Sequence, residues 1–465
     1  MRRKIASPAT WVFLVVATGF YLSFSHLVRS RPPFLRTGFS DGINFNPKSP
    51  FPSPGFSSSP TTSTESPPAP SAQPDKGRLS SESRSAYINA IMVPEATELP
   101  RLRCPKPDVS RYEHLTRKEG DESPVIQYLF AIDLRQCLPK LPRLIGSVVE
   151  AIRLLGPRAC ALSITEGNSD DGTAEVLAAL RPELEALKTT YYYRTSAINP
   201  QEGDRIAKLA ELRNLAVQPL IDKVESARFS AANTTVVFLN DVAICAEDIL
   251  ELIHQRRFQG ADMACAMDWT YAGQDPTFYD VWVARGMTGD SFFEIPADGN
   301  WNSAWNLFWN DADAAARFAA HQPFQVFSCW NGAVAFTAAP LMTMGDGDHD
   351  DDGDDGDTGK GPVRFRRARD GECFGGEPQL FCKDMWFHGY GRIAVVPAVN
   401  LEYSDERAQQ IKAAKGYTST WARGPPDWAG GDRINWRSQP PDTVKCIPNY
   451  DSQFWEAWNK TQPGT

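Results

Sequence analysis

From about residue 104 onward, short runs of β-branched and aromatic residues alternate with segments whose apolar side chains recur at helical spacing. The clearest helical segment is 142–155, where Leu144, Val148 and Ile152 would share one face. This alternation predicts an α/β fold related to the Rossmann fold, with a mostly parallel sheet flanked by helices on both faces. We expect strands at 125–132, 160–165, 189–194, 235–239 and 261–267, and further helices at 173–187, 206–220 and 247–256.

The N-terminal pattern is different, because residues 11–28 are apolar almost throughout and follow the basic sequence Met1-Arg2-Arg3-Lys4. A run of about 20 apolar residues is long enough to span a bilayer as a helix. We therefore expect a cytoplasmic tail at 1–8 and a transmembrane signal anchor at 9–28, which would place the rest of the chain in the secretory lumen. A cleaved signal peptide is the alternative, although no clean small-residue cleavage site follows the run.

A segment rich in Pro and Ser follows the apolar run, with eleven Pro and nine Ser between residues 32 and 74. Such a composition buries too little apolar surface to fold, so 29–100 is expected to be an extended stem. One lumenal domain would then cover 104–462. Two glycosylation triplets, at Asn233 and Asn459, and nine cysteines fit an oxidising lumen. The odd number of cysteines leaves at least one outside an intramolecular disulfide.

The composition is that of a folded protein, with 42% hydrophobic and 23% charged residues, which excludes wholesale disorder and a multi-span membrane protein. A net charge of −9 argues against nucleic-acid binding. Eight Asp and no Lys or Arg lie within 346–357, so the rest of the chain carries only −1. Residues 348–353 reproduce the first half of a calcium-binding EF-hand loop, but its twelfth position would be Gly359 instead of Glu. We interpret 345–361 as an acidic disordered insertion.

Ligands of parallel α/β sheets bind beyond the carboxyl ends of the strands, which directs attention to the residues after each predicted strand. The second strand is followed by a polar turn at 166–173, which contains Glu166, Ser169, Asp170 and Thr173. Carboxylates and backbone N–H groups at such a helix start can contact a nucleotide. The alternative is a loop in which Asp170 or Thr173 caps the next helix.

The fourth predicted strand ends at Asn240-Asp241. A carboxylate in this position can hold a divalent cation, which would neutralise a departing diphosphate. The alternative is an ordinary turn Asp. On the preceding helix, Arg205 and Arg213 could reach a phosphate or the acidic strand end, or could lie on a solvated face. The predicted sheet brings both strand-end motifs to one edge.

At this point the sequence resembles nucleotide-sugar glycosyltransferases of the GT-A fold, with a degenerate Asn240-Asp241 pair in place of two separated Asp. Five segments in the right order make it similar to the fungal capsule-associated and cryptococcal α-1,3-mannosyltransferase family, glycosyltransferase family sixty-nine. This resemblance implies a single-pass type II Golgi enzyme that transfers mannose from GDP-mannose to a mannoside or polysaccharide acceptor. It also implies retention of configuration and help from a divalent metal ion such as Mn²⁺. The five segments are 238–252, 265–269, 278–286, 328–336 and 369–404.

The resemblance also implies roles for individual residues. Asp241 would be the main metal ligand and His388 a further one, although a helix C-terminal His is an equally simple explanation for His388. Glu377 and Asp384, beside Lys383, would join Asp241 as catalytic residues. Trp330 and Asn331 would bind the acceptor, because an aromatic ring suits the apolar face of a sugar. The donor would contact Glu166, Ser169, Asp170, Thr173, Arg213, Asn240, Asp268, Asp280 and Arg285.

One alternative from another functional class remains open at the level of sequence. A protein with this fold could be a non-catalytic factor for export or assembly of a capsule or cell-wall polysaccharide, as the degenerate Asn240-Asp241 pair would allow. A lectin-like module is disfavoured, because it would leave the nucleotide-facing turn without a purpose.

Overall fold

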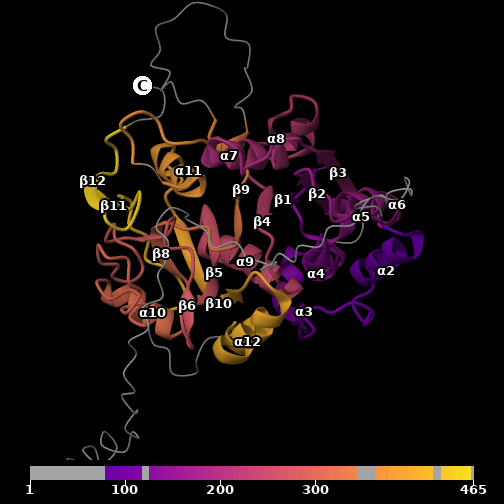
Figure 1. Ribbon diagram of the computed structural model, residues 1–465, viewed down its shortest axis with the longest axis horizontal. Coiled ribbons are helices and arrows are strands. Elements are labelled where there is room, and N and C mark those ends of the chain that lie inside the picture. The colour runs from indigo at the N-terminus through magenta and orange to yellow at the C-terminus, as the bar shows by residue number, and fades with distance from the viewer. Residues whose placement is uncertain (1–78, 118–124, 343–361, 374, 423–430, 462–465) are drawn as a thin grey trace, which may run out of the picture. The chain divides into compact units, whose positions relative to one another are not determined.

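The computed structural model describes residues 79–117, 125–342, 362–373, 375–422 and 431–461. Contacts divide the chain into Met1–Glu65 and Ser66–Thr465, and all of the described residues belong to the second unit. A ten-stranded sheet runs through this unit in the order β3-β2-β1-β4-β9-β5-β10-β8-β7, with β6 paired to β5 (Figure 1). Its strands are β1 (Tyr128–Leu134), β2 (Cys160–Glu166), β3 (Thr190–Thr195), β4 (Thr235–Leu239), β5 (Met263–Tyr271), β6 (Pro276–Phe278), β7 (Arg285–Gly286), β8 (Phe324–Ser328), β9 (Ala333–Thr337) and β10 (Ile393–Leu401).

The expected mostly parallel sheet is confirmed in the direction of its strands. β1 pairs in parallel with β2 and β4, β2 with β3, and β5 with β10. β9 lies antiparallel between β4 and β5, so these two still point the same way. The order β3-β2-β1-β4 is that of a doubly wound nucleotide-binding sheet, in which the ligand crevice lies where the order reverses. In this protein the reversal falls between β1 and β4.

Helices cover both faces of the sheet. Figure 1 shows α7 and α11 on one side of the central strands, with α4 and α9 on the other. A separate hairpin, β11 (Thr443–Cys446) with β12 (Phe454–Ala457), lies near the C-terminus. The helices are α2 (Ser81–Met92), α3 (Val109–Tyr112), α4 (Leu141–Leu155), α5 (Thr173–Ala179), α6 (Arg181–Ala186), α7 (Arg205–Ala216), α8 (Gln218–Ile221), α9 (Ala246–Gln259), α10 (Ala312–Ala319), α11 (Glu377–Phe387), α12 (Asp405–Lys415) and α13 (Thr418–Trp421).

The alternation of side chains along β1 explains why the apolar core has two layers, one on each face of the sheet. Tyr128, Phe130 and Ile132 point into a cluster with the apolar faces of α4, α5 and α9. Leu129 and Ala131 point to the opposite side, into a cluster with residues of α7 and α11. Successive side chains of a strand face opposite sides of the sheet, so a strand covered on both faces is apolar throughout. This is why β1 reads as a continuous apolar run.

The sequence-based elements agree with the structure in type and differ at their ends. All five expected strands form, and the expected helix at 142–155 is α4. The expected helix at 173–187 divides into α5 and α6, since Pro182 removes a backbone donor at the junction. The expected helix at 206–220 ends earlier, because Pro219 begins the separate short helix α8.

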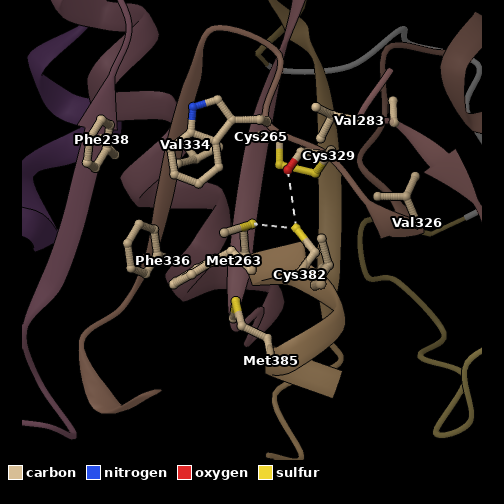
Figure 2. Close-up of a cluster of buried hydrophobic side chains, with 14 of the residues drawn as sticks. Phe238, Met263, Cys265, Val283, Val326, Cys329, Val334, Phe336, Cys382 and Met385 are labelled. Carbon is tan, nitrogen blue, oxygen red and sulfur yellow. Dashed lines mark hydrogen bonds between the residues drawn. A yellow bond between two sulfur atoms is a disulfide. The ribbon is translucent and has the colours of Figure 1, made fainter. Parts of the chain in front are cut away.

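Six cysteines form disulfides in pairs far apart in sequence, Cys104–Cys245, Cys265–Cys329 and Cys373–Cys446. Cys137, Cys160 and Cys382 are buried free thiols. Figure 2 shows Cys382 beside the Cys265–Cys329 disulfide, where its Sγ lies 3.4 Å from the Cys329 carbonyl oxygen. The expected unpaired cysteine is therefore found, and it packs in the core next to the segment that carries Trp330 and Asn331.

The structure tests the predictions for the N-terminal region only in part. The expected tail at 1–8 and anchor at 9–28 lie outside the described residues, and within the described part no helix is long and apolar enough to span a membrane. The expected stem at 29–100 includes α2, which buries Ala90 and Ile91, so folded structure begins earlier than residue 104. The acidic insertion at 345–361 also lies outside the described residues.

Candidate active site

Several polar residues meet at the edge of the sheet where the strand order reverses. Leu134, the last residue of β1, pairs with Glu166 of β2, and Ile132 pairs with Leu239 of β4. β9 starts at the same edge, because Ala333 pairs with Leu239. The turn after β2, Asn240-Asp241 and the segment Asn331-Gly332 therefore share the edge at which nucleotides bind in such sheets.

Arg213 forms the buried cationic centre of this edge. Its Nε donates to Glu377 Oε1 at 2.8 Å, and both terminal nitrogens lie 3.4 Å from Asn240 Oδ1. Its guanidinium also lies 4.7 Å from the centroid of the Trp330 ring, whose Nε1 donates to Asn240 Oδ1 at 3.1 Å. Burial alone would lower the pKa of Arg213, but the charges of Glu377 and Asp133 outweigh it and raise the pKa.

Asp241 is accessible to solvent, with a side chain 40% exposed. Its Oδ2 accepts a hydrogen bond from Lys140 Nζ at 2.5 Å, which joins the end of β4 to the loop after β1. Burial alone would lower the pKa of Lys140, but the Asp241 carboxylate outweighs it, so the pKa lies above its ordinary value. An incoming phosphate at this place would meet a fully charged ammonium group.

Asp268 and Asp280 form a pair of acids beside the cationic centre. Asp268 is fully buried; its Oδ2 accepts from the Tyr403 hydroxyl at 2.9 Å, and its Oδ1 has no hydrogen-bond partner among the described residues. Asp280 is partly exposed, and its Oδ2 accepts from the backbone N–H of Asn331 at 2.9 Å. Burial raises the pKa of Asp268 well above its usual range, with the charge of Asp280 adding to the effect. Burial likewise raises the pKa of Asp280, to about 6.

The raised pKa of Asp280 predicts a pH dependence of stability. An unfolded Asp titrates near pH ~4, while folded Asp280 keeps its proton up to about pH 6. The folded state thus binds more protons between these values, so the free energy of unfolding should fall as pH rises through this window. Asp280→Asn should flatten this slope without removing it, because Asp268 still titrates. Denaturant unfolding across the window, with Asp451→Asn at an exposed site as control, measures the slope; equal slopes for wild type and Asp280→Asn would contradict the assignment.

The turn after β2 is held to the loop after β1 by a network of hydrogen bonds. Glu166 Oε1 accepts from the backbone N–H of Ser169 at 2.8 Å, and Ser169 Oγ accepts from the backbone N–H of Gln136 at 2.8 Å. Asp170 Oδ1 accepts from Gln136 Nε2 at 2.5 Å. These four residues lie together at the carboxyl ends of β1 and β2, and Asp170 remains exposed there.

The cap of α5 differs from the sequence expectation. Asp171, and not Asp170 or Thr173, binds the first backbone N–H of the helix, through Oδ1 at 2.9 Å from Thr173 N. Thr173 is buried, and its Oγ1 donates to Asp171 Oδ1 and accepts from the Cys137 N–H. Thr173 therefore fixes the loop in this structure. Among the residues of the turn that were predicted to contact the donor, Asp170 is the one whose side chain is exposed to a ligand.

Three predicted site residues, Asp384, His388 and Arg285, lie elsewhere or face other partners, and so does Lys383. Asp384 pairs with Arg366 at 2.6 Å, and the His388 ring nitrogen Nδ1 lies 2.7 Å from the Asp384 carbonyl oxygen. Since α11 rises about 1.5 Å per residue, His388 lies ~16 Å along the helix from Glu377. Arg285 is buried and donates to three backbone carbonyls, one of them on β11. Lys383 pairs with Glu372 at 2.7 Å.

Trp330 differs most from its expected role. The side chain is 1% exposed, and Arg213, Phe238 and Phe365 pack around the ring. Asn331 is also buried, where its amide donates to the Ala266 carbonyl at 2.8 Å. An acceptor platform needs an open aromatic face. In this structure the Trp330 side chain instead donates to Asn240, and the backbone N–H of Asn331 donates to Asp280.

Comparison with known sequences decides the family. A family model described as cryptococcal mannosyltransferase 1 matches residues 127–384, more than half of the chain. The chain belongs to this family. The alpha-1,3-mannosyltransferase CMT1 of Cryptococcus neoformans var. neoformans serotype D is 34% identical over 354 residues, which are 72% of this chain and 72% of the relative. The protein is accordingly a glycosyltransferase, and the resemblance inferred from its motifs is confirmed.

Similarity of this glycosyltransferase to solved structures is more distant. The Staphylococcus aureus protein TarS, residues 1–349, matches with a TM-score of 0.32 and 13% identity, and the match covers 60% of each chain. GalNAc-T7 with UDP, GalNAc and Mn²⁺ matches with a TM-score of 0.34 and 12% identity, over 87% of this chain and 64% of that one. TM-scores this low establish neither a shared activity nor a shared cofactor.

The family resemblance implies a divalent cation, and the residues of the glycosyltransferase site show which of them could bind one. Within the described ranges, no group of three or more His, Cys, Asp or Glu side chains is arranged to hold a metal ion. Asn240 Oδ1 is already bonded to Arg213 and Trp330, and His388 lies far along α11. One exposed carboxylate can nevertheless bind such an ion together with phosphate oxygens and water. The residues therefore fit a cation shared between Asp241 and a bound diphosphate.

Four residues of the site were not predicted from the sequence. Asp133 and Gln136 follow from the strand-end rule applied to β1, because Asp133 is the next to last residue of this strand, opposite Thr165 of β2, and Gln136 comes two residues after the strand end. Gln136 has a left-handed φ of 53°, which directs its N–H toward Ser169. Lys140 and Tyr403 carry no local sequence signal, because only the tertiary structure brings them to Asp241 and Asp268.

Proposed function

We propose that this glycosyltransferase transfers mannose from GDP-mannose to the 3-hydroxyl group of a mannoside or polysaccharide acceptor, with retention of configuration. The observation that carries the proposal is the arrangement of Lys140 and Arg213 on either side of Asn240-Asp241, at the point where the strand order reverses. Cationic groups at this edge suit a nucleoside diphosphate. The name of the 34% identical relative supports mannose and the α-1,3 linkage.

In this proposal the diphosphate lies between the loop after β1 and the end of β4. Lys140 would exchange its bond to Asp241 for bonds to phosphate oxygens, which stabilises negative charge as the bond to the sugar breaks. A divalent cation, held by Asp241 and the phosphates, would supply further charge neutralisation. Arg213 is too enclosed by Glu377 and three aromatic rings to move, so it would act as a fixed positive charge that keeps Asn240 in place.

The sugar would lie toward Asp280, which is the accessible member of the acid pair. A carboxylate there can stabilise positive charge on the anomeric carbon while the acceptor attacks on the face from which GDP departs, or it can act as a nucleophile that displaces GDP and is then displaced by the acceptor; each of these two routes gives retention. Asp268, fully buried beside it, would hold Tyr403 through its hydrogen bond to the hydroxyl. The guanosine would lie along the turn that contains Glu166, Ser169 and Asp170.

We also propose that the chain is a single-pass type II membrane protein of the Golgi, anchored by 9–28 with its catalytic domain in the lumen. The three disulfides support an oxidising compartment, because such bonds are rare in proteins of the cytosol. The Pro/Ser-rich segment before the folded unit supports a stem that separates the enzyme from the membrane.

A thermal-shift screen tests the choice of donor. The purified full chain is heated with GDP-mannose, UDP-glucose, UDP-galactose or GDP alone, each with and without Mn²⁺. Ligands that bind only the folded state raise the melting temperature, so we expect the largest rise with GDP-mannose and Mn²⁺. Lys140→Met should reduce this rise, because the ammonium group would bind the phosphates. A larger shift with a UDP-sugar, or equal shifts for the wild type and Lys140→Met, would contradict the proposed donor site.

A further inference from the structure

The segment between β7 and α10 carries an unusual combination of residues. Residues 299–310 (GNWNSAWNLFWN) contain three Trp and four Asn, and no charged residue. Trp305 is 82% exposed and Trp309 is 44% exposed, although large aromatic side chains are normally covered. Exposed indole rings cost free energy in water, so a surface that presents them repeatedly marks a binding site.

This segment is tied to the candidate active site by stacked aromatic rings. Trp301 packs edge-on against Phe293, and its Nε1 lies 3.3 Å from the Tyr450 hydroxyl. Tyr450 stacks on Trp282 with ring centroids 4.8 Å apart. Trp282 is only two residues from Asp280, so their Cα atoms lie within ~7 Å of each other. Trp282, Tyr450 and Trp301 thus form a chain of contacts that starts near Asp280, and the exposed Trp305 follows four residues after Trp301. These four residues are here called the aromatic strip.

The backbone of the strip is held in position. The Trp301 carbonyl accepts from the Ala304 N–H, which closes a turn directly before Trp305. A Cβ atom at Gly299 would lie 2.4 Å from a carbon of the Tyr450 ring, so the chain packs too closely on Tyr450 for a larger residue there. Asn300 is fixed by hydrogen bonds to Asp298. A backbone held in this way sets the positions from which the aromatic side chains extend, which reduces the ordering needed when a rigid ligand binds.

The chemistry of the strip favours a neutral sugar polymer. Aromatic faces pack against the apolar faces of sugar rings, while Asn side chains offer both donors and acceptors to hydroxyl groups. The absence of charge from 299–310 gives no attraction to an anionic or a basic partner. Trp330, the ring expected to bind the acceptor, is enclosed in the core, whereas the aromatic strip includes an exposed ring at Trp305.

We propose that the aromatic strip binds a neutral oligosaccharide acceptor at sugar residues distant from the reacting hydroxyl, so that the enzyme prefers extended chains over short acceptors. This inference rests on the proposed function, since it assigns the acceptor of the same site. Trp282 and Tyr450 would contact the sugar residues near Asp280, and Trp305 would contact residues farther along the chain.

The test compares a long with a short acceptor. The full chain is assayed with GDP-mannose and either methyl α-mannoside or a long α-mannan oligosaccharide, and the ratio of the two kcat/KM values is measured. Trp305→Ala should lower the long-to-short ratio roughly 2- to 10-fold, as expected for the loss of one aromatic contact, through KM for the long acceptor. Trp305→Tyr should restore much of the ratio, and Val224→Ser, at another exposed apolar residue, should leave it unchanged.

A second measurement needs no turnover and separates this inference from the proposed function. In affinity electrophoresis, neutral mannan in the gel should retard the wild type and retard Trp305→Ala less. A wild type that transfers to neither acceptor would contradict the proposed function, while retardation that depends on Trp305 would still support the strip. Equal long-to-short ratios and equal retardation for the wild type and Trp305→Ala would overturn the proposed role of the strip. If Trp305→Ala lost only the binding of phosphatidylcholine vesicles, the proposed role of the strip would also be overturned. The Trp residues would then belong to a membrane-binding surface.

Discussion

Asp241→Ala is expected to lower kcat for mannosyl transfer by at least about 100-fold, the effect of removing one preorganised electrostatic group from an active site. Asp241 is the accessible carboxylate at the point where the strand order reverses, and no other described side chain near it completes a metal site. The variant would lose the proposed cation and the position of Lys140 together. Initial rates with GDP-mannose and a saturating mannoside acceptor provide the measurement.

Two controls separate this loss from a folding defect. The Lys140–Asp241 pair is partly exposed on both sides, so breaking it should change the free energy of unfolding by about 1 kcal/mol or less. Asp241→Asn keeps the size of the side chain and removes the charge, and should be nearly as inactive as Asp241→Ala. A rate like that of the wild type in either variant would remove Asp241 from the reaction.

Arg213→Ala is expected to lower the free energy of unfolding by about 3–5 kcal/mol, because it leaves the Glu377 carboxylate buried without its partner. The two side chains are 9% and 4% exposed and lie 2.8 Å apart. The guanidinium also fills the space between Phe238 and Trp330, so its removal leaves a cavity as well. Denaturant unfolding of the purified full chain measures the change.

Matched variants distinguish the charge from the cavity. Arg213→Met combined with Glu377→Gln removes both charges and should recover much of the stability, though not the activity, since Asn240 loses its guanidinium contact. Arg181→Ala breaks an exposed pair with Glu185 and should cost about 1 kcal/mol or less. If Arg213→Ala lowered the free energy of unfolding no more than Arg181→Ala does, the result would contradict a buried ion pair at the site.

The sequence pattern predicts the first half of the fold well and the second half poorly. Strands β1 to β5 alternate with amphipathic helices, so both the elements and the parallel order follow from the pattern. β9 is an equally apolar run, but nothing in its residues shows that it runs antiparallel between β4 and β5. α11 is buried from Glu377 to Trp386, so its side chains show no polar face and no helical period.

The site was predictable where a residue follows a strand and unpredictable where tertiary packing decides. Asn240 and Asp241 lie at the expected edge because their strand is unmistakable. The sequence could not show that Asp171 caps α5, since adjacent acids are equivalent in a pattern. Nor could it show that Arg213 covers Trp330, because their contact joins a helix to a loop 117 positions later in the chain.

The central claim is that Asp241 and its neighbours carry out mannosyl transfer with retention. The most direct test incubates the full chain with GDP-mannose, Mn²⁺ and an α-mannoside acceptor, and determines the product by NMR. We predict a new α-1,3-linked mannose from the wild type and none from Asp241→Ala. An inverted product, or no product from a folded wild type that binds the nucleotide, would contradict the claim; the second result would favour a non-catalytic role in polysaccharide export or assembly.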